Sequence, residues 1–266
     1  MMPNRARRHH HHVEQRNNAH TYMRSLRGEE TNTLFITYTM VQGTVDPSTP
    51  GVYNNPSTVV FTFNGTSCAD HFIEYFHFQK ATSEIVEPEL IRRVARWIIE
   101  DFRRQRRLLP DYVIVLRDQV RDEMQPVVED LEFEAFKSSL AEYAESTEGA
   151  TDWLPRYAFG LAPWRPEHTE PLVYLFRNDD NIFSAYEEFQ NLIVNMFITI
   201  RVRNFRFSVL EPIWAAENTA KLWTKLFPGF ASLMETRNRG FSRLDGSNQY
   251  DWVAISLQFH TETIEV

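Results

Sequence analysis

Short runs of β-branched and aromatic residues recur along the chain, and each run is bounded by polar or turn-forming residues. Such runs are typical of strands with one or both faces buried. They predict strands at 33–41, 58–64, 71–79, 112–117, 171–176, 200–209 and 252–259. Only a short connection separates 58–64 from 71–79, so these two segments are expected to form an antiparallel hairpin.

Apolar residues at helical spacing alternate with these strands and predict helices at 88–108, within 127–144, after Ser184 and at 212–227. Pro88 suits the first turn of the first helix, because the missing N–H has no partner there anyway. Ser184 and Glu187 have the spacing of a capping box for the third helix.

The order of these elements predicts the fold class. Three strands come first, and helix 88–108 then crosses over to bring strand 112–117 beside strand 33–41. We therefore expect a three-layer α/β domain whose central sheet mixes parallel and antiparallel strands. Asp118 follows strand 112–117, at the carboxyl end where chemistry gathers in such sheets. It is expected either to terminate the strand or to bind a metal ion.

Length and composition indicate one large domain. Residues 1–30 are polar, basic and without periodicity, so we expect a disordered basic arm followed by a domain over 31–266. No run is long and apolar enough for a membrane span, and the amino-terminal segment lacks the apolar core of a secretory signal. The single cysteine, Cys68, fits a reducing compartment, so a cytoplasmic or nuclear location is expected. His9 to His12 are either native or a tag and are left out of the search for sites.

Charge is unevenly distributed. The net charge is −8 and the isoelectric point is near 5.6, which argues mildly against an unaided grip on a long nucleic acid. Seven arginines nevertheless fall within 92–107, so one helix carries either a phosphate-binding face or a solvated outer face.

Four segments together resemble the Piwi domain of the Argonaute family, which has the ribonuclease-H-like fold. The resemblance follows the chain in order, from about residue 33 to about residue 226. The segments are "NPSTVVFTFNG" with "HFIEYFHFQKATSEIV", then "PDYVIVLRDQV", "YLFRNDDNIFSAYEEFQNLI" and "EPIWAAENTAKLWTK".

The resemblance implies a site in which carboxylates hold two Mg²⁺ ions for RNA cleavage. Transferred position by position, the family's first aspartate becomes Thr39, its glutamate is Glu84, its second aspartate is Asp118, and its last ligand falls on Ala216 or Glu217. Thr39 is the decisive departure, because a neutral hydroxyl cannot replace a carboxylate that bridges two divalent ions. The resemblance therefore implies a degenerate nuclease site with no cofactor, or with Mg²⁺ at a residual site of Asp118 and Glu84.

Positive charge and the same resemblance together indicate the candidate RNA contacts. The family's Arg-x-Arg pair helps to hold the 5′ phosphate of a guide. It corresponds here to the stretch 221–225, whose only basic residues are Lys221 and Lys225. The candidate RNA contacts are Arg201, Arg203, Arg206, Lys221 and Lys225.

Three classes of function remain open from the sequence. The first is a catalytically degenerate Piwi-domain protein of a small-RNA silencing pathway, whose partners are small RNA or silencing proteins. The second is a metal-dependent endoribonuclease that uses Glu84 and Asp118. The third is a protein scaffold with no nucleic-acid contact.

Overall fold

The structure is a computed structural model that describes residues 32–45, 48, 53–65, 72–79, 83–163, 175–195, 197–202 and 205–236. Several sequence predictions lie outside these residues. They are the arm 1–30 with His9 to His12, Arg203, Cys68, most of strand 171–176 and the strand at 252–259.

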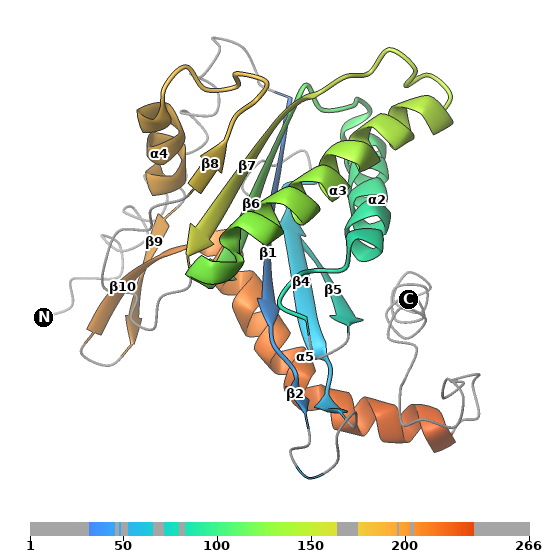
Figure 1. Cartoon of the computed structure of the whole chain (residues 1–266), viewed down its shortest axis with the longest axis vertical. Helices are drawn as coiled ribbons and strands as arrows, with labels where there is room; N and C mark the ends of the chain where they lie inside the picture. Colours follow the sequence, from blue (N-terminus) through green and yellow to red (C-terminus); the bar gives the residue numbers. More distant parts are fainter. Residues whose placement is uncertain are drawn as a thin grey trace, which may run out of the picture.

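The described chain begins with five strands, and helices are interspersed among the later strands (Figure 1). The strands are β1 (Thr33–Val41), β2 (Thr44–Val45), β3 (Tyr53–Asn55), β4 (Ser57–Phe63), β5 (Ile73–Gln79), β6 (Tyr112–Val120), β7 (Arg156–Pro163), β8 (Leu175–Arg177), β9 (Phe197–Val202) and β10 (Phe205–Leu210). The helices are α2 (Pro88–Arg106), the short 3-10 helix η1 (Asp122–Met124), α3 (Gln125–Ser146), α4 (Tyr186–Asn195) and α5 (Glu211–Thr236).

A six-stranded sheet in the order β5-β4-β1-β6-β7-β8 forms the centre of the molecule. β4 pairs antiparallel with β1 and β5, β6 pairs parallel with β1 and β7, and β8 pairs antiparallel with β7. This mixed order, in which β4 is antiparallel to both of its neighbours, is the ribonuclease-H-like arrangement. The predicted three-layer α/β class is confirmed, and so is the predicted hairpin.

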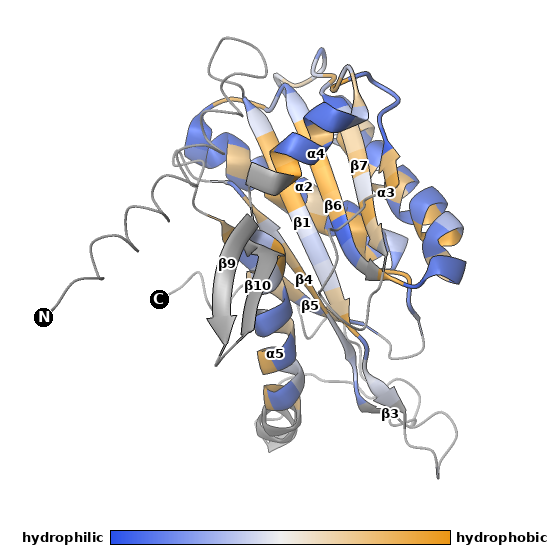
Figure 2. Cartoon of the chain, turned by 90° about the vertical axis from the view of Figure 1, so that its left-hand side faces the viewer, coloured by the Kyte–Doolittle hydropathy of each residue, from blue (hydrophilic) through white to orange (hydrophobic). Residues whose placement is uncertain are grey.

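Helices cover both faces of the sheet. α2 and α3 lie side by side over one face, and α4 and α5 lie over the other (Figures 1 and 2). Figure 2 shows apolar residues, in orange, along the strands of the sheet. Alternation along β1 explains the two cores: Leu34, Ile36 and Tyr38 pack against α2 and α3, whereas Phe35 packs in the cluster that contains α4.

Helix α2 forms for the reasons that its sequence suggests. Pro88 occupies the first turn, and the predicted apolar stripe is buried, including Ile91, Val94, Ile98 and Phe102. The helix ends at Arg106, because Arg107 adopts a left-handed conformation (φ 62°). Pro110 therefore follows the end of the helix and does not cause it.

The structure adds one strand to the predicted elements and corrects two of them. β7 was not predicted, because "RYAFGLAP" contains a glycine, a proline and an arginine and so lacks a clear strand pattern. The expected single strand 200–209 is a hairpin of β9 and β10, since the chain reverses between Val202 and Phe205. The third helix starts at Tyr186, and Ser184 bonds to the carboxylate of Glu188 instead of Glu187.

Tyr157 offers a test of the packing on the α3 side. It is fully buried against Phe133, burial raises the pKa of its phenol well above the usual value, and its hydroxyl has no hydrogen-bond partner. A buried hydroxyl without a partner is destabilising. We expect Tyr157→Phe to leave the free energy of unfolding unchanged or to raise it by up to about 1 kcal/mol in urea unfolding.

A matched control is available in Tyr143. Its hydroxyl donates to the Glu100 carboxylate and accepts a hydrogen bond from Arg103 Nη1 at 3.5 Å. Tyr143→Phe removes the same atom from a hydroxyl that has partners, so it should cost about 1 kcal/mol. A larger loss for Tyr157→Phe than for Tyr143→Phe would refute this description of the core.

Candidate functional site

Thr39 and Asp118 lie next to each other at the carboxyl ends of the two central parallel strands. Tyr38 pairs with Arg117 in the register of β1 and β6, so the next positions along both strands are Thr39 and Asp118. Both residues are buried. The prediction that these two positions occupy neighbouring strands is confirmed.

The sequence suggested that the strand ends before Asp118, but in the structure Asp118 lies within the strand. β6 continues to Val120, and the pairing with β7 shifts between Arg117 and Val120. Such a bulge bends a strand and changes the direction of its side chains. Ile114 and Leu116 pack with α4, and the buried Asp118 follows them where the pairing with β7 becomes irregular.

Threonines line the face of the sheet beneath α5. Thr37 Oγ1 and Thr62 Oγ1 lie 2.5 Å apart and share a hydrogen bond, and Thr62 Oγ1 also donates to the carbonyl oxygen of Pro212 at 3.4 Å. Thr58 and Thr224 share a hydrogen bond of 2.8 Å. Thr39 differs from these threonines, because its buried hydroxyl has no hydrogen-bond partner. A neutral, unsatisfied hydroxyl therefore occupies the position where the resemblance implies a bridging carboxylate.

Glu217 lies on the same side of the sheet. The contacts of Pro212 with Thr62 and of Thr224 with Thr58 show that α5 runs along β4. Because Thr62 pairs with Thr37 and Thr58 pairs with Val41, the helix runs toward the carboxyl end of β1. Ile213 packs in the cluster around Leu116, and Glu217 follows one helical turn later, toward the carboxyl ends of β1 and β6. Its side chain is only 12% exposed and accepts a hydrogen bond of 3.1 Å from Lys221 Nζ. Ala216, the other candidate for this position, packs on Val60.

Glu84 is held near the end of β6 by the residue that follows that strand. It forms an ion pair with Arg121, whose Nε donates to Glu84 Oε2 at 2.8 Å, directly after β6. Among the residues that the structure describes, no three histidine, cysteine, aspartate or glutamate side chains are grouped so as to hold a metal ion. A neutral Thr39 and a Glu84 already bound to a guanidinium do not fit a two-metal centre.

Arg117, the neighbour of Asp118, has a structural role on the side of the sheet that α3 covers. Its side chain is 1% exposed and its Nε lies 3.3 Å from Glu132 Oε2, while Glu132 is completely buried. Glu132 also accepts hydrogen bonds from the Tyr38 hydroxyl and, at 2.7 Å, from the Val86 backbone N–H. Burial raises the pKa of Glu132, although Arg117 and the two hydrogen bonds act against this shift.

Sequence reasoning missed this buried cluster, which we call the Glu132 cluster and define as Tyr38, Val86, Arg117 and Glu132. A signal was present in α3. Glu132 lies one turn from both Val128 and Phe136, within a stripe of buried apolar residues. A carboxylate in such a stripe indicates a buried partner of opposite charge. The cluster connects the segment that carries Glu84 to β1, β6 and α3.

The Asp-Asp-Asn stretch after β8 is also structural. Asp180 Oδ2 accepts a hydrogen bond of 2.8 Å from the Tyr157 backbone N–H, and Asp179 pairs with Arg177 at 3.1 Å. Asn181 has a φ of 51°, a left-handed conformation that asparagine tolerates better than most residues. These side chains therefore shape the turn that leads to α4.

The candidate RNA contacts lie in two places. Arg201 and Arg206 are paired across the hairpin of β9 and β10. Lys221 and Lys225 are exposed on α5. Several arginines of α2 bind within the chain instead: Arg92 pairs with Glu89, Arg104 with Asp101, and Arg106 donates to the Asn64 carbonyl oxygen at 2.9 Å.

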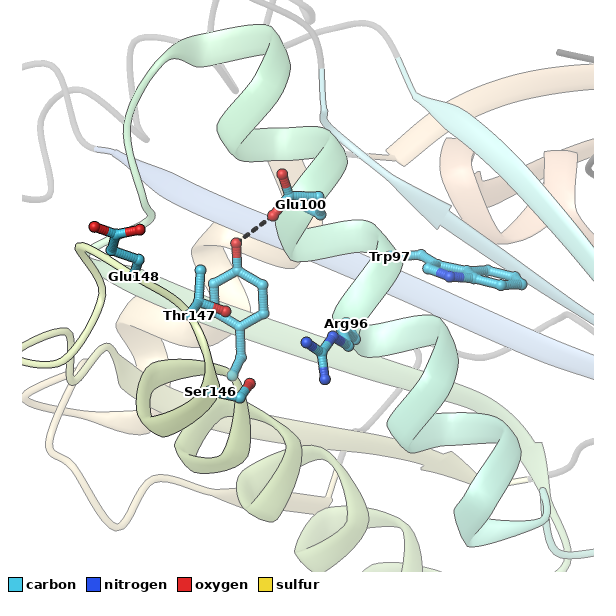
Figure 3. Close-up of a pocket in the computed structure, with 7 residues that line it drawn as sticks. Arg96, Trp97, Glu100, Ser146, Thr147 and Glu148 are labelled. Atoms are coloured by element: carbon cyan, nitrogen blue, oxygen red, sulfur yellow. Dashed lines mark hydrogen bonds between the residues drawn. The ribbon is translucent and has the colours of Figure 1, made fainter.

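A separate pocket of about 390 Å³ opens between α2 and the end of α3 (Figure 3). It is lined by Arg96, Trp97, Glu100, Tyr143, Ser146, Thr147 and Glu148. The Tyr143 hydroxyl donates a hydrogen bond to the Glu100 carboxylate. Figure 3 shows Trp97 pointing away from the other labelled side chains. The pocket lies on the side of the sheet that α2 and α3 cover, opposite α4 and α5.

No helix in the described part of the chain combines the length and apolar character that crossing a bilayer requires. Comparison with models of known protein families finds no match. Comparison with curated protein sequences finds none either.

Comparison with solved structures finds partial similarity to Argonaute proteins. Argonaute of Kluyveromyces polysporus with a guide RNA has 12% identity and a TM-score of 0.46, over 57% of this chain and 16% of that chain. The MID-PIWI domains of N. crassa QDE-2 have 16% identity and a TM-score of 0.43, over 62% of this chain and 43% of that chain. Argonaute of Marinitoga piezophila in complex with 5′ OH guide RNA has 10% identity and a TM-score of 0.46, over 76% of this chain and 31% of that chain.

This chain thus spans less than half the length of each of these three structures. The superpositions are partial and the identities are low. The fold is therefore assigned from the strand order of this chain itself, which is ribonuclease-H-like.

Proposed function

We propose that this chain is a degenerate Piwi-like domain of a small-RNA silencing pathway, which binds RNA, silencing proteins or both without cutting RNA. The observation that carries the proposal is Thr39, a buried neutral residue beside Asp118 at the carboxyl ends of β1 and β6. The ribonuclease-H-like strand order and the four Piwi-like sequence segments support it. The proposed location is the cytoplasm or the nucleus.

The chemistry of the site supports binding without cleavage. Metal-assisted cleavage of an RNA backbone requires divalent ions that are held by several carboxylates. Glu217 belongs to α5, whereas Glu84 is already held in an ion pair by Arg121. The residues do not fit a two-metal centre, so the proposed activity involves no bound metal.

An endoribonuclease remains the second candidate, and the position of Glu217 is the observation that favours it. This nearly buried carboxylate lies on the helix that packs on β1, the neighbour of the strand that carries Asp118, so the two could act together on one divalent ion. Cleavage that requires both residues would support this candidate. A protein scaffold is the outcome if neither cleavage nor RNA binding is found.

The RNA-binding part of the proposal depends on Arg201, Arg203, Arg206, Lys221 and Lys225. Phosphates supply most of the affinity in non-specific binding, and the net charge of −8 opposes it. We therefore expect a dissociation constant on the order of 10⁻⁵ M or weaker at physiological salt. Lysine lacks the bidentate fork of arginine, so a 5′ phosphate on the RNA should add little affinity.

A salt titration with 5′-phosphorylated and 5′-hydroxyl RNA tests this expectation by fluorescence anisotropy. Affinity should fall steeply with salt, and Lys225→Gln should reduce the slope of log affinity against log salt by about one. Arg104→Gln is the matched control, because Arg104 already pairs with Asp101 on the other face of the molecule. Tight, salt-resistant binding that depends on the 5′ phosphate would make the chain a working guide binder.

A further inference from the structure

Helix α3 exposes a pair of apolar residues beside a pair of acidic residues. Val127 and Leu131 lie one turn apart and are 41% and 45% exposed. Asp130 lies one position before Leu131, and Glu134 lies three positions after it. Both acidic residues are exposed, so the outer surface of α3 has an apolar seam with negative charge along one side.

Helix α5 exposes the same pattern with the opposite charge. Leu222 and Leu226 lie one turn apart and are 53% and 43% exposed. Lys221 lies one position before Leu222, and Lys225 lies three positions after it. The two lysines stand at the same offsets from Leu222 as the two acidic residues of α3 do from Leu131. Viewed down the helix axis, the charged residues therefore lie on the same side of the apolar seam in both helices, which we call the same rotational side.

We propose that α3 of one copy of this chain packs antiparallel against α5 of a second copy. In an antiparallel helix pair, positions on the same rotational side of the two seams face each other across the contact. Val127 and Leu131 then meet Leu222 and Leu226, and Asp130 and Glu134 face Lys221 and Lys225. The partner is a second copy because the chain itself carries both halves of this complementary pattern.

The position of the two helices determines what kind of assembly results. α3 and α5 lie on opposite faces of the central sheet, so the two contact surfaces of one molecule point in opposite directions (Figure 1). Contact between unlike surfaces is heterologous and continues from copy to copy unless the rotation closes a ring. The two helix surfaces are small compared with the roughly 1,200 Å² that a stable interface buries, so the association is weak.

Sedimentation velocity of the full chain tests the proposal between about 5 µM and about 500 µM, a range suited to so small an interface. The weight-average sedimentation coefficient should rise with concentration without stopping at the value of a dimer. High salt should reduce the rise, because exposed charges are screened. A coefficient that stays at the monomer value over the whole range would overturn the proposal.

Two blocked variants identify the surfaces. Leu131→Arg blocks the α3 surface and Leu222→Glu blocks the α5 surface; each places a charge opposite charges of the same sign. Each variant should be monomeric alone, and a mixture of the two should form a dimer and nothing larger, because one α5 surface and one α3 surface remain intact. A variant that self-associates as strongly as the wild type would contradict the contact between unlike surfaces.

Leu131 and Leu222 are exposed, so both variants should fold. A circular dichroism melt of each variant checks its folding. Leu154→Arg is the matched control: Leu154 is 84% exposed and belongs to neither surface, so its variant should associate like the wild type. Charge exchange gives an independent check. Lys225→Glu should weaken association, and adding Asp130→Lys should restore it; failure of the restoration would overturn the antiparallel pairing.

Discussion

Replacing Glu132 with leucine is expected to cost about 3–5 kcal/mol of unfolding free energy, which is a large part of the stability of a domain. The reason is the guanidinium of Arg117, which is 1% exposed and would remain buried without its counter-charge. The Tyr38 hydroxyl and the Val86 N–H would lose their acceptor as well. Urea unfolding measures the change.

A double-mutant cycle separates the charge from the hydrogen bonds. In Arg117→Met/Glu132→Leu no buried charge remains, so the cost should fall to about 2 kcal/mol, the loss of two hydrogen bonds. Glu84→Gln is the control, since Arg121 in that ion pair is 53% exposed and surface pairs contribute about 0–1 kcal/mol. Additive costs for Arg117→Met and Glu132→Leu would show that the two charges do not interact.

The direction of the pKa shift of Glu132 determines how the stability of the protein depends on pH. Burial raises the pKa of Glu132 above its unfolded value. A carboxyl group with a raised pKa in the folded state stabilises the protein below the unfolded pKa, and this stabilisation is lost as pH rises through the folded pKa. The stability advantage of the wild type over Glu132→Gln should therefore be largest in acid and decrease toward neutral pH.

Replacing Thr39 with aspartate is expected to make stability depend on divalent metal ions. The new carboxylate would be buried beside Asp118, and two like charges that are removed from water should cost roughly 3–5 kcal/mol. Mn²⁺ or Mg²⁺ would neutralise the pair and should return about 1–3 kcal/mol at saturation. Thermal unfolding with and without metal measures both effects.

Thr39→Asn is the matched control for this substitution. Asparagine has nearly the same size and shape as aspartate but no charge, so its variant should respond to metal no more than the wild type does. An equal metal response of Thr39→Asp and Thr39→Asn would mean that Asp118 and position 39 do not form a cation site. The degenerate-site proposal would then lose its structural basis.

The central sheet could be predicted from the sequence because its strands are buried and nearly uniform in composition. Strand 33–41 consists of apolar and β-branched residues, and so does strand 112–117 up to Arg117. The helix that precedes strand 112–117 favours a parallel crossover to strand 33–41. The adjacency of Thr39 and Asp118 follows directly from that register. β7 could not be found in this way, since Gly160 and Pro163 interrupt its pattern and only pairing with β6 makes it a strand.

The environment of the candidate site was harder to predict than its position. The bulge after Arg117 extends β6 beyond Asp118, and nothing in the local residues specifies a bulge. The partners of Glu84 and Arg117 are distant in sequence: Arg121 lies 37 residues from Glu84, and Glu132 belongs to α3. Such partners are fixed by tertiary packing and not by spacing along the chain.

Incubation of single-stranded RNA with the purified chain and Mg²⁺ or Mn²⁺, with and without a complementary guide, tests the central claim most directly. The same samples, run on a native gel and a denaturing gel, report binding and cleavage together. We expect intact RNA in every lane, with weak, salt-sensitive retention by the protein. Metal-dependent cleavage that Asp118→Ala abolishes would contradict it and would identify the chain as an endoribonuclease.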